Sequence, residues 1–310
     1  MSRFVLGIDV GGTNIKCGLV DPSGKISLRT AFPTKSFAQS KSALIKALVS
    51  CAQKTITQND IGKKDILGIG IGFPGLVDFP KGMVHCLVNI PGWKNVFVKK
   101  IIQQEIGIPT FVDNDVNLMA LGEWKFGAGR GVKNVVCITL GTGVGGGLII
   151  NNALYRGEGF SAGEIGHTPI NENGPRCNCG GTGCLERYVG NKYLLEKSKK
   201  IFRGKTISFP EITRLAAKGN RKAIAFWEEV GFHLGIGLTG VVNILNPDRI
   251  VIGGGVSNNH RYLFPAIKKT ILQRAMKIPA RMAKIVKAQL GEDAGIIGAQ
   301  VLVNHAVSAK

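Results

Sequence analysis

The stretch IDVGGTNIKCGLVD (residues 8–21) consists of an apolar run, a glycine turn and a second apolar run. The stretch ITLGTGVGGGLIIN (138–151) repeats this plan 130 residues later. Short apolar runs that are bounded by glycines are typical of buried strands, so each stretch predicts a strand, a tight turn and a strand. One repeated hairpin is weak evidence by itself, but two α/β lobes built on the same plan would explain it.

The second glycine turn carries the spacing G-x-G-x-x-G at Gly141, Gly143 and Gly146, which in a dinucleotide-binding unit opens a helix. The apolar residues that follow predict a strand, so the context argues against a Rossmann site, and the chain contains no P-loop spacing. The alternative is a hairpin whose backbone N–H groups face an anion, because glycine has no Cβ to block a phosphate. Two such hairpins that face each other could hold the phosphates of a nucleotide, and two plain structural hairpins are the competing interpretation.

Side chains beside both turns suit a nucleotide and its Mg²⁺. Asp9 ends the first strand, where its carboxylate can hold Mg²⁺ directly or through water, and Lys16 lies just beyond the turn. Thr13 and Thr142 supply hydroxyls for phosphate oxygens. The predicted nucleotide contacts at the two turns are Asp9, Gly11, Gly12, Thr13, Lys16, Gly141, Thr142 and Gly143.

The apolar periodicity predicts further helices and strands that alternate along the chain. The helices are expected at 42–57, 96–106, 118–124, 192–202, 210–218, 221–245, 261–276 and 294–307, and the strands at 66–73, 110–112 and 249–252. Residues 159–191 show no periodicity and predict an irregular loop.

The chain of 310 residues carries 40 Lys and Arg against 20 Asp and Glu, a net charge of +20. Half of the basic residues lie within 187–290, which holds only five acidic residues. This excess fits a nucleic acid, a polyanionic substrate or a solvated surface. The basic residues fall mostly on predicted helices without interleaved aromatic residues, and the spacings typical of nucleic-acid-binding motifs are missing. We therefore favour a solvated basic face and no nucleic-acid partner.

The apolar run at the start of the chain is interrupted by Asp9 and is followed by no cleavage site, so it does not predict a signal peptide. No stretch reaches the roughly 18 apolar residues of a membrane span. We expect a cytoplasmic protein without a membrane partner. Because the cytoplasm is reducing, no disulfide is expected. Four scattered cysteines are expected to be buried and unpaired: Cys17, Cys51, Cys86 and Cys137.

The segment RCNCGGTGCLE (176–186) places Cys177, Cys179 and Cys184 within eight residues. A closed tetrahedral set of N and S ligands is typical of structural Zn²⁺, and three thiolates leave one position for a histidine. His167 lies ten residues upstream in the same predicted loop, whereas His233 falls inside a long apolar helix. A redox pair would need C-x-x-C beside a thioredoxin-like unit, and neither is present. Unliganded thiols are the other alternative.

Four motifs follow one another along the chain: DVGGTNIK (9–16), LGTGVGGG (140–147), GEIGH (163–167) and CNCGGTGCLE (177–186). Together they resemble the signature of the ROK family of sugar kinases and sugar-responsive repressors, and the likeness runs from residue 5 to about residue 300. The resemblance implies the two-lobed actin-like and hexokinase-like ATPase fold, with duplicated ribonuclease H-like domains and a central cleft. It also agrees with a Cys₃His zinc site.

The resemblance implies a division of the chain into two lobes. A smaller N-terminal α/β lobe would comprise residues 1–117 and be rejoined by a C-terminal helix at about 296–310. A larger lobe of residues 118–295 would carry the zinc loop.

Within the family, the repressors carry an extra N-terminal DNA-binding module, and here the first predicted strand starts at residue 4. We therefore expect an ATP-dependent hexose kinase that converts glucose to glucose 6-phosphate in glycolysis, with Mg²⁺-bound ATP as co-substrate and a structural Zn²⁺. The alternatives are N-acetylmannosamine, N-acetylglucosamine, mannose or fructose as acceptor, polyphosphate as donor, and a non-catalytic sugar sensor. The family resemblance implies a homodimer or a homotetramer.

The resemblance also assigns roles to single residues. Asp115 matches the general base that takes the proton of the sugar hydroxyl, although its place at a helix start also fits an N-cap. Asp113 matches no family role and is expected to be structural. The implied sugar contacts are Gly75, Asn89, Asn114, Asp115, Glu164, His167 and Glu186, and the implied adenosine contacts are Gly254, Gly255 and Asn258.

Overall fold

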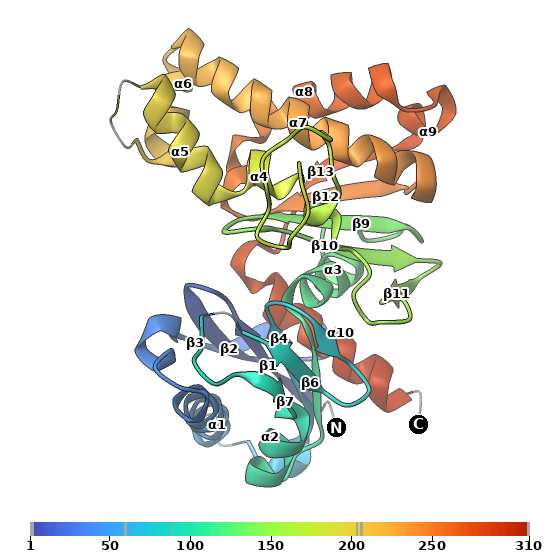
Figure 1. Cartoon of the computed structure of the whole chain (residues 1–310). Coiled ribbons are helices and arrows are strands. Elements are labelled where there is room, and N and C mark those ends of the chain that lie inside the picture. Colours follow the sequence, from blue (N-terminus) through green and yellow to red (C-terminus); the bar gives the residue numbers. More distant parts are fainter. Residues whose placement is uncertain (1–2, 59–60, 88, 203, 205–206, 309–310) are drawn as a thin grey trace. The chain divides into compact units, whose positions relative to one another are not determined.

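The computed structural model describes residues 3–58, 61–87, 89–202, 204 and 207–308 (Figure 1). The chain divides into two compact units. Unit 1 comprises residues 1–131, 147–162 and 289–310, and unit 2 comprises residues 132–146 and 163–288. Unit 1 thus takes in the residues expected for the small lobe, together with residues 118–131, 147–162 and 289–295.

Unit 1 is built on a five-stranded sheet with the strand order β3-β2-β1-β4-β8. β2 runs antiparallel to both β1 and β3, whereas β4 runs parallel to both β1 and β8. The strands are β1 (Phe4–Val10), β2 (Asn14–Val20), β3 (Ile26–Pro33), β4 (Ile66–Phe73) and β8 (Thr110–Asn114). The helices are α1 (Lys41–Thr57), α2 (Val98–Ile106), α3 (Asp115–Phe126) and α10 (Ala294–Ser308).

Glycines on the central strands let α10 lie directly against this sheet. A Cβ at Gly70 of β4 would come 2.7 Å from the Cβ of Ala299, and one at Gly7 of β1 would come 2.5 Å from the carbonyl oxygen of Ile296. Both distances are far inside van der Waals contact, so a larger residue at either position would push the helix away from a close-packed core. The same packing explains why nearly every residue of β4 is buried.

A small antiparallel sheet follows β4 in unit 1. Its strands are β5 (Val77–Asp78), β6 (Met83–Cys86) and β7 (Lys94–Val96).

The expectation for the scattered cysteines is wrong in two respects. Cys17 on β2 and Cys51 on α1 form a disulfide. α1 packs against β2, and both cysteines belong to the buried faces of their elements, so the two side chains meet. Cys86 is exposed at the end of β6. Cys137 is buried and lies outside the disulfide, as expected.

The second five-stranded sheet has the order β11-β10-β9-β12-β13, in which β12 runs parallel to β9 and β13. The strands are β9 (Val135–Leu140), β10 (Val144–Ile150), β11 (Ala153–Tyr155), β12 (Arg249–Gly253) and β13 (Lys284–Lys287). The helices of unit 2 are α4 (Glu186–Val189), α5 (Asn191–Ile201), α6 (Phe209–Ala217), α7 (Arg221–Leu245), α8 (His260–Arg274) and α9 (Lys277–Met282).

Short 3₁₀ turns complete the described structure. They cover Thr34–Phe37, Lys63–Asp65, Ile165–His167, Gly255–Asn259 and Gly291–Asp293.

Both predicted hairpins are present, as β1–β2 and β9–β10. No helix follows the second glycine turn, because β10 begins at Val144 within the glycine run. This confirms that the G-x-G-x-x-G spacing is not a dinucleotide fingerprint. Strand β3 was not predicted because its residues alternate between partly buried and exposed positions, which leaves no continuous apolar run.

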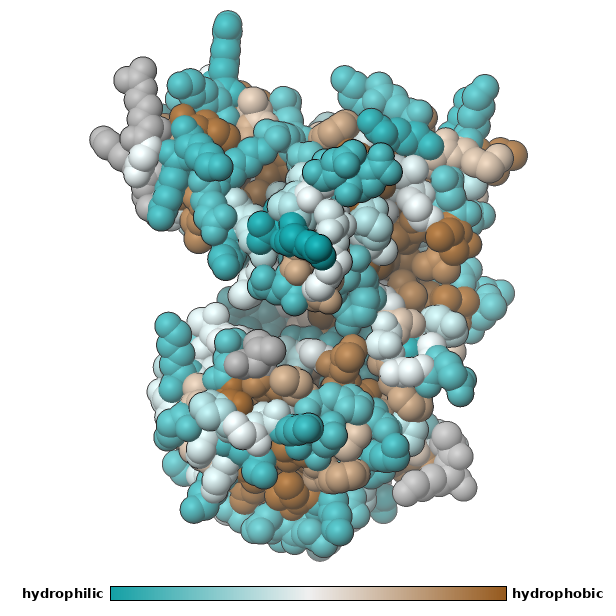
Figure 2. Space-filling view, viewed as in Figure 1, coloured by the Kyte–Doolittle hydropathy of each residue, from teal (hydrophilic) through white to brown (hydrophobic). Residues whose placement is uncertain are grey.

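The helices of unit 2 carry much of the positive charge. Hydrophilic atoms dominate the visible surface over α5, α6 and α8 (Figure 2), in the part of the chain that holds half of all Lys and Arg. Among the helices that the structure describes, none combines the length and the apolar character that a bilayer span requires.

Candidate active site and metal centre

The first glycine turn joins β1 to β2 and pairs Asp9 with Lys16 across the antiparallel register. The amide of Gly11 donates to the carbonyl of Asn14 at 3.0 Å and closes the turn. Thr13 is exposed at its tip. The turn thus combines exposed backbone with a carboxylate and a lysine, which is the set of groups that a phosphate and its Mg²⁺ require.

The surroundings of Asp9 only partly compensate for the burial of its negative charge. Burial raises the pKa of Asp9 from 3.8 to about 6, and Lys16 opposes this rise only in part. The start of α10 contributes to the burial, since a Cβ at Gly295 would lie 2.8 Å from the carboxyl carbon of Asp9. A divalent cation at the carboxylate would replace the lost hydration, so Asp9 fits an Mg²⁺ ligand.

The second glycine turn is held by Glu186 of α4. The amide of Gly141 donates to the carbonyl of Gly143 (3.0 Å), and the amide of Val144 donates to Oε2 of Glu186 (2.9 Å). A Cβ at Gly143 would lie 2.5 Å from the same oxygen, so this contact needs a glycine. A residue predicted to bind sugar therefore contacts a turn predicted to bind phosphate.

The loop predicted to contact adenosine begins where β12 ends. Gly254 has a φ of 80°, and a Cβ there would overlap the backbone of Leu140, the last residue of β9. Asn258 is exposed, and its Oδ1 accepts from Nζ of Lys287 at 2.9 Å. Since Leu140 leads into the second glycine turn, the structure brings two predicted nucleotide segments of unit 2 together.

At the junction of β8 and α3, the neighbouring residues Asn114 and Asp115 occupy different positions in the structure. Oδ1 of Asn114 accepts from the amide of Val116 at 2.8 Å and caps α3. Its Nδ2 donates to the carbonyl of Gly75 at 3.0 Å. Asp115 is the first residue of α3 and is partly buried. The capping role that competed with catalysis for Asp115 is thus filled by Asn114.

Four predicted metal ligands form one cluster in unit 2. The ligand atoms of His167, Cys177, Cys179 and Cys184 all lie within 4.8 Å of one another. Sγ of Cys179 lies 3.6 Å from Sγ of Cys184, and Sγ of Cys177 lies 3.8 Å from Nδ1 of His167. Zn–S bonds of about 2.3 Å in a tetrahedral site separate the sulfurs by about 3.8 Å. The cluster therefore fits Zn²⁺.

Glycines let the chain turn around this cluster. Gly180 and Gly183 have φ values of 95° and 65°, which only glycine adopts without strain. The amide of Cys177 donates to the carbonyl of Gly181 at 2.8 Å. Burial and the neighbouring sulfurs raise the pKa of Cys184 to about 12, so the thiolate of Cys184 that Zn²⁺ needs would form only with the cation present.

His167 can serve in both of its predicted roles. Its Nδ1 faces Cys177, whereas its Nε2 lies 3.9 Å from Oε2 of Glu164. One nitrogen can thus bind the metal while the other donates to a carboxylate or a sugar hydroxyl. Glu164 directly precedes the 3₁₀ turn that ends at His167, and its side chain is exposed.

The other predicted sugar contacts lie in unit 1. Gly75 and Asn114 are joined by their hydrogen bond, and Asn89 is exposed in the turn between β6 and β7. Arg156, which follows β11, was not predicted, yet it forms an ion pair with the buried Asp113. A charged residue directly after a strand was the only hint in the sequence, and by itself it indicates no function.

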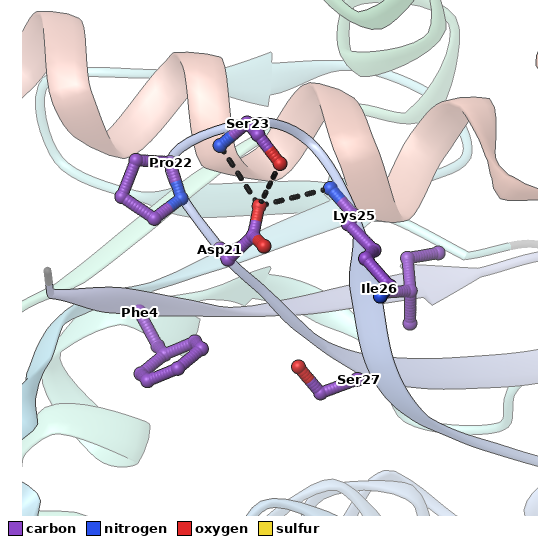
Figure 3. Close-up of a pocket in the computed structure, with 7 residues that line it drawn as sticks. All are labelled: Phe4, Asp21, Pro22, Ser23, Lys25, Ile26 and Ser27. Carbon is purple, nitrogen blue, oxygen red and sulfur yellow. Dashed lines mark hydrogen bonds between the residues drawn. The ribbon is translucent and has the colours of Figure 1, made fainter.

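A pocket lies at the turn between β2 and β3 and contains none of the predicted site residues (Figure 3). Oδ1 of Asp21 accepts from the amides of Ser23 and Lys25 and from the hydroxyl of Ser23. The carboxylate therefore closes the turn. The lining residues are Phe4, Asp21, Pro22, Ser23, Lys25, Ile26 and Ser27.

A family model described as the ROK family matches residues 5–306. The chain belongs to the ROK family. A glucokinase of Halalkalibacterium halodurans is 37% identical over 98% of this chain and 96% of its own length. A xylose repressor of Bacillus subtilis is 31% identical over 97% of this chain but only 77% of its own length.

The ROK glucokinase of Streptomyces griseus, solved with glucose and AMPPNP, has the same fold. It is 31% identical with a TM-score of 0.83, and the match covers 97% of this chain and 99% of that one. The prediction of an actin-like and hexokinase-like ATPase fold is thereby confirmed.

The raised pKa of Asp9 predicts a stability cost at neutral pH. Between pH 4 and 6 the folded chain binds more protons at Asp9 than the unfolded chain does, so its contribution to stability falls as the pH rises. Asp9→Asn, which resembles the neutral carboxyl, should stabilise the nucleotide-free protein at pH 7.5 by about 1 to 3 kcal/mol. The gain should shrink towards pH 4.5. Urea unfolding at both pH values measures this gain, with Asp65→Asn, in the 3₁₀ turn Lys63–Asp65, as the control. No gain at pH 7.5 would contradict the account of Asp9.

The metal cluster predicts one bound Zn²⁺ per chain. Cys184→Ser should lose the metal and lower the melting temperature, because a structural zinc site contributes directly to folding. Cys86→Ser removes an exposed thiol outside the cluster and should keep the metal. Elemental analysis of the purified protein measures the zinc. A wild-type protein without stoichiometric zinc would refute the site.

Proposed function

We propose that this protein is an ATP-dependent hexose kinase, with glucose as the leading acceptor and glucose 6-phosphate as the product. The observation that carries the proposal is the junction of β8 and α3, where Asn114 caps the helix and Asp115 takes its first position. The glucokinase relatives and the ROK glucokinase solved with glucose and AMPPNP support the same reaction.

Asp115 is proposed as the general base. Its partly buried carboxylate would accept the proton of the sugar hydroxyl as the oxygen attacks the γ-phosphorus of ATP. The neighbouring Asp113 is the poorer candidate, because its carboxylate is almost fully buried and forms an ion pair with Arg156. Of the two acids in the segment, the local structure thus favours Asp115.

The two glycine turns are proposed to bind the phosphates of ATP through their backbone amides, and the loop at Gly254, Gly255 and Asn258 to contact the adenosine. Asp9 would hold Mg²⁺, which neutralises charge on the transferring phosphoryl group when it is bound. Lys16 would add a positive charge beside the first turn.

The hexose is proposed to be bound by carboxylates, side-chain amides and backbone groups that the family resemblance assigns to it. Glu164, His167 and Glu186 would accept from or donate to its hydroxyls, and charge-assisted bonds of this kind contribute roughly 1.5–3 kcal/mol each. Gly75, Asn89 and Asn114 are the proposed contacts of unit 1. The zinc would perform no chemistry, since its four protein ligands close the site, and would brace the loop that carries Glu164 and Glu186.

A sugar sensor without catalysis is the competing function, because a xylose repressor is also a relative. It would bind sugar and release no ADP. The cytoplasm is the proposed location, since the three thiols of the metal cluster are free, as a reducing compartment would keep them; the Cys17–Cys51 disulfide argues against it. A dimer or a tetramer is the assembly that the family resemblance implies.

Asp115→Ala should abolish turnover and leave folding and glucose binding nearly intact. General-base catalysis contributes about 10² to 10⁴ in rate, so kcat should fall at least a hundredfold. A coupled assay of ADP release measures kcat, and calorimetry measures the glucose Kd. Asp65→Ala, in a 3₁₀ turn of unit 1, is the matched control. A variant that keeps a tenth of the wild-type kcat would show that Asp115 is not the base.

A further inference from the structure

Arg156 and Asp113 form an ion pair that neither the motifs nor the proposed function uses. Asp113 is the last residue but one of β8, and it is almost fully buried, with 1% of its surface exposed. Nε and Nη2 of Arg156 both donate to its Oδ2, at 2.8 and 2.7 Å. The guanidinium also lies over the ring of Phe79, 3.9 Å from the ring centre, which holds it from a second side.

The other oxygen of Asp113 faces the start of α3. Its Oδ1 accepts from the amide of Asn114 at 2.7 Å and from Nδ2 of Asn117 at 2.9 Å. A carboxylate has about four acceptor positions, and four N–H groups occupy them here. Arg156 therefore fixes the orientation of this carboxylate from one side. Through its other oxygen, the carboxylate in turn fixes the backbone directly before Asp115.

The backbone of Arg156 also forms a hydrogen bond that closes the loop leading to a proposed sugar contact. Its carbonyl accepts from the amide of Ala162 at 2.9 Å and closes the loop of residues 156–162. Gly163 and Glu164 follow this loop directly, and Glu164 is a proposed sugar contact. One guanidinium thus anchors both the segment of the proposed base and the loop that leads to the sugar-binding residues.

We propose that Arg156, acting through Asp113, is a positioning residue for phosphoryl transfer. It touches no reacting atom; it holds the β8–α3 junction so that the carboxylate of Asp115 meets the sugar hydroxyl in line with the phosphoryl group. The inference rests on the proposed function. Rates of this kind of step are sensitive to placement, and a displacement of about 1 Å can cost roughly a hundredfold.

Arg156→Met should lower kcat at least tenfold and change the sugar KM less than threefold. Arg156→Lys, which keeps the charge and loses the two-pronged contact, should give an intermediate kcat. Arg214→Ala breaks an exposed Arg–Glu pair on α6 and serves as the matched control, with kcat unchanged. If kcat of Arg156→Met stays within twofold of the wild type, the proposal is overturned.

A purely structural ion pair could also lower activity, because Arg156→Met leaves a buried charge unpaired. The double variant Asp113→Asn with Arg156→Met removes both charges and should recover most of the lost melting temperature. Positioning predicts that kcat of the double variant stays at least tenfold below wild type despite this recovery. Recovery of kcat together with stability would overturn the proposal.

The same assays separate this inference from the proposed function. If the wild-type protein phosphorylates a hexose and all Arg156 variants have the same kcat, only the positioning role is contradicted. A wild-type protein that phosphorylates no hexose contradicts the proposed function and removes the positioning role with it.

Discussion

A carboxylate that is taken out of water must find hydrogen bonds to replace its hydration, and Asp113 imposes this requirement at the end of β8. Two of its partners are N–H groups at the start of α3, and two belong to the guanidinium of Arg156. The strand end, the helix start and the loop after β11 are therefore fixed by one buried group. Asp115 takes its place as a consequence of this arrangement.

In unit 2, a short segment of the chain connects the metal cluster to the second glycine turn. Cys184 belongs to the cluster, and Glu186, two residues later, accepts from the amide of Val144. The absence of a Cβ at Gly143 makes room for this contact. A zinc ion that stiffens the loop would thus also steady a turn that is proposed to bind phosphate, although it would perform no chemistry itself.

Much of this could be predicted from the sequence because the glycine turns and the cysteine cluster are local patterns. The strand–turn–strand plan of residues 8–21 and 138–151 and the proximity of His167 to the three cysteines depend on short segments. The Cys17–Cys51 disulfide and the Arg156–Asp113 pair join residues far apart in sequence, and no single-sequence pattern specifies such pairs. Similarly, neighbouring polar residues could not reveal that Asn114 occupies the N-cap position of α3 and Asp115 its first helical position.

We propose that the chain transfers a phosphoryl group to a hexose. The most direct measurement is ³¹P NMR of the wild-type protein with Mg²⁺, offered glucose, mannose, fructose, N-acetylglucosamine and N-acetylmannosamine in turn, each with ATP or with polyphosphate. We expect equal amounts of ADP and glucose 6-phosphate from ATP and glucose. Sugar binding without a phosphorylated product from any pair would contradict it and favour a sensor.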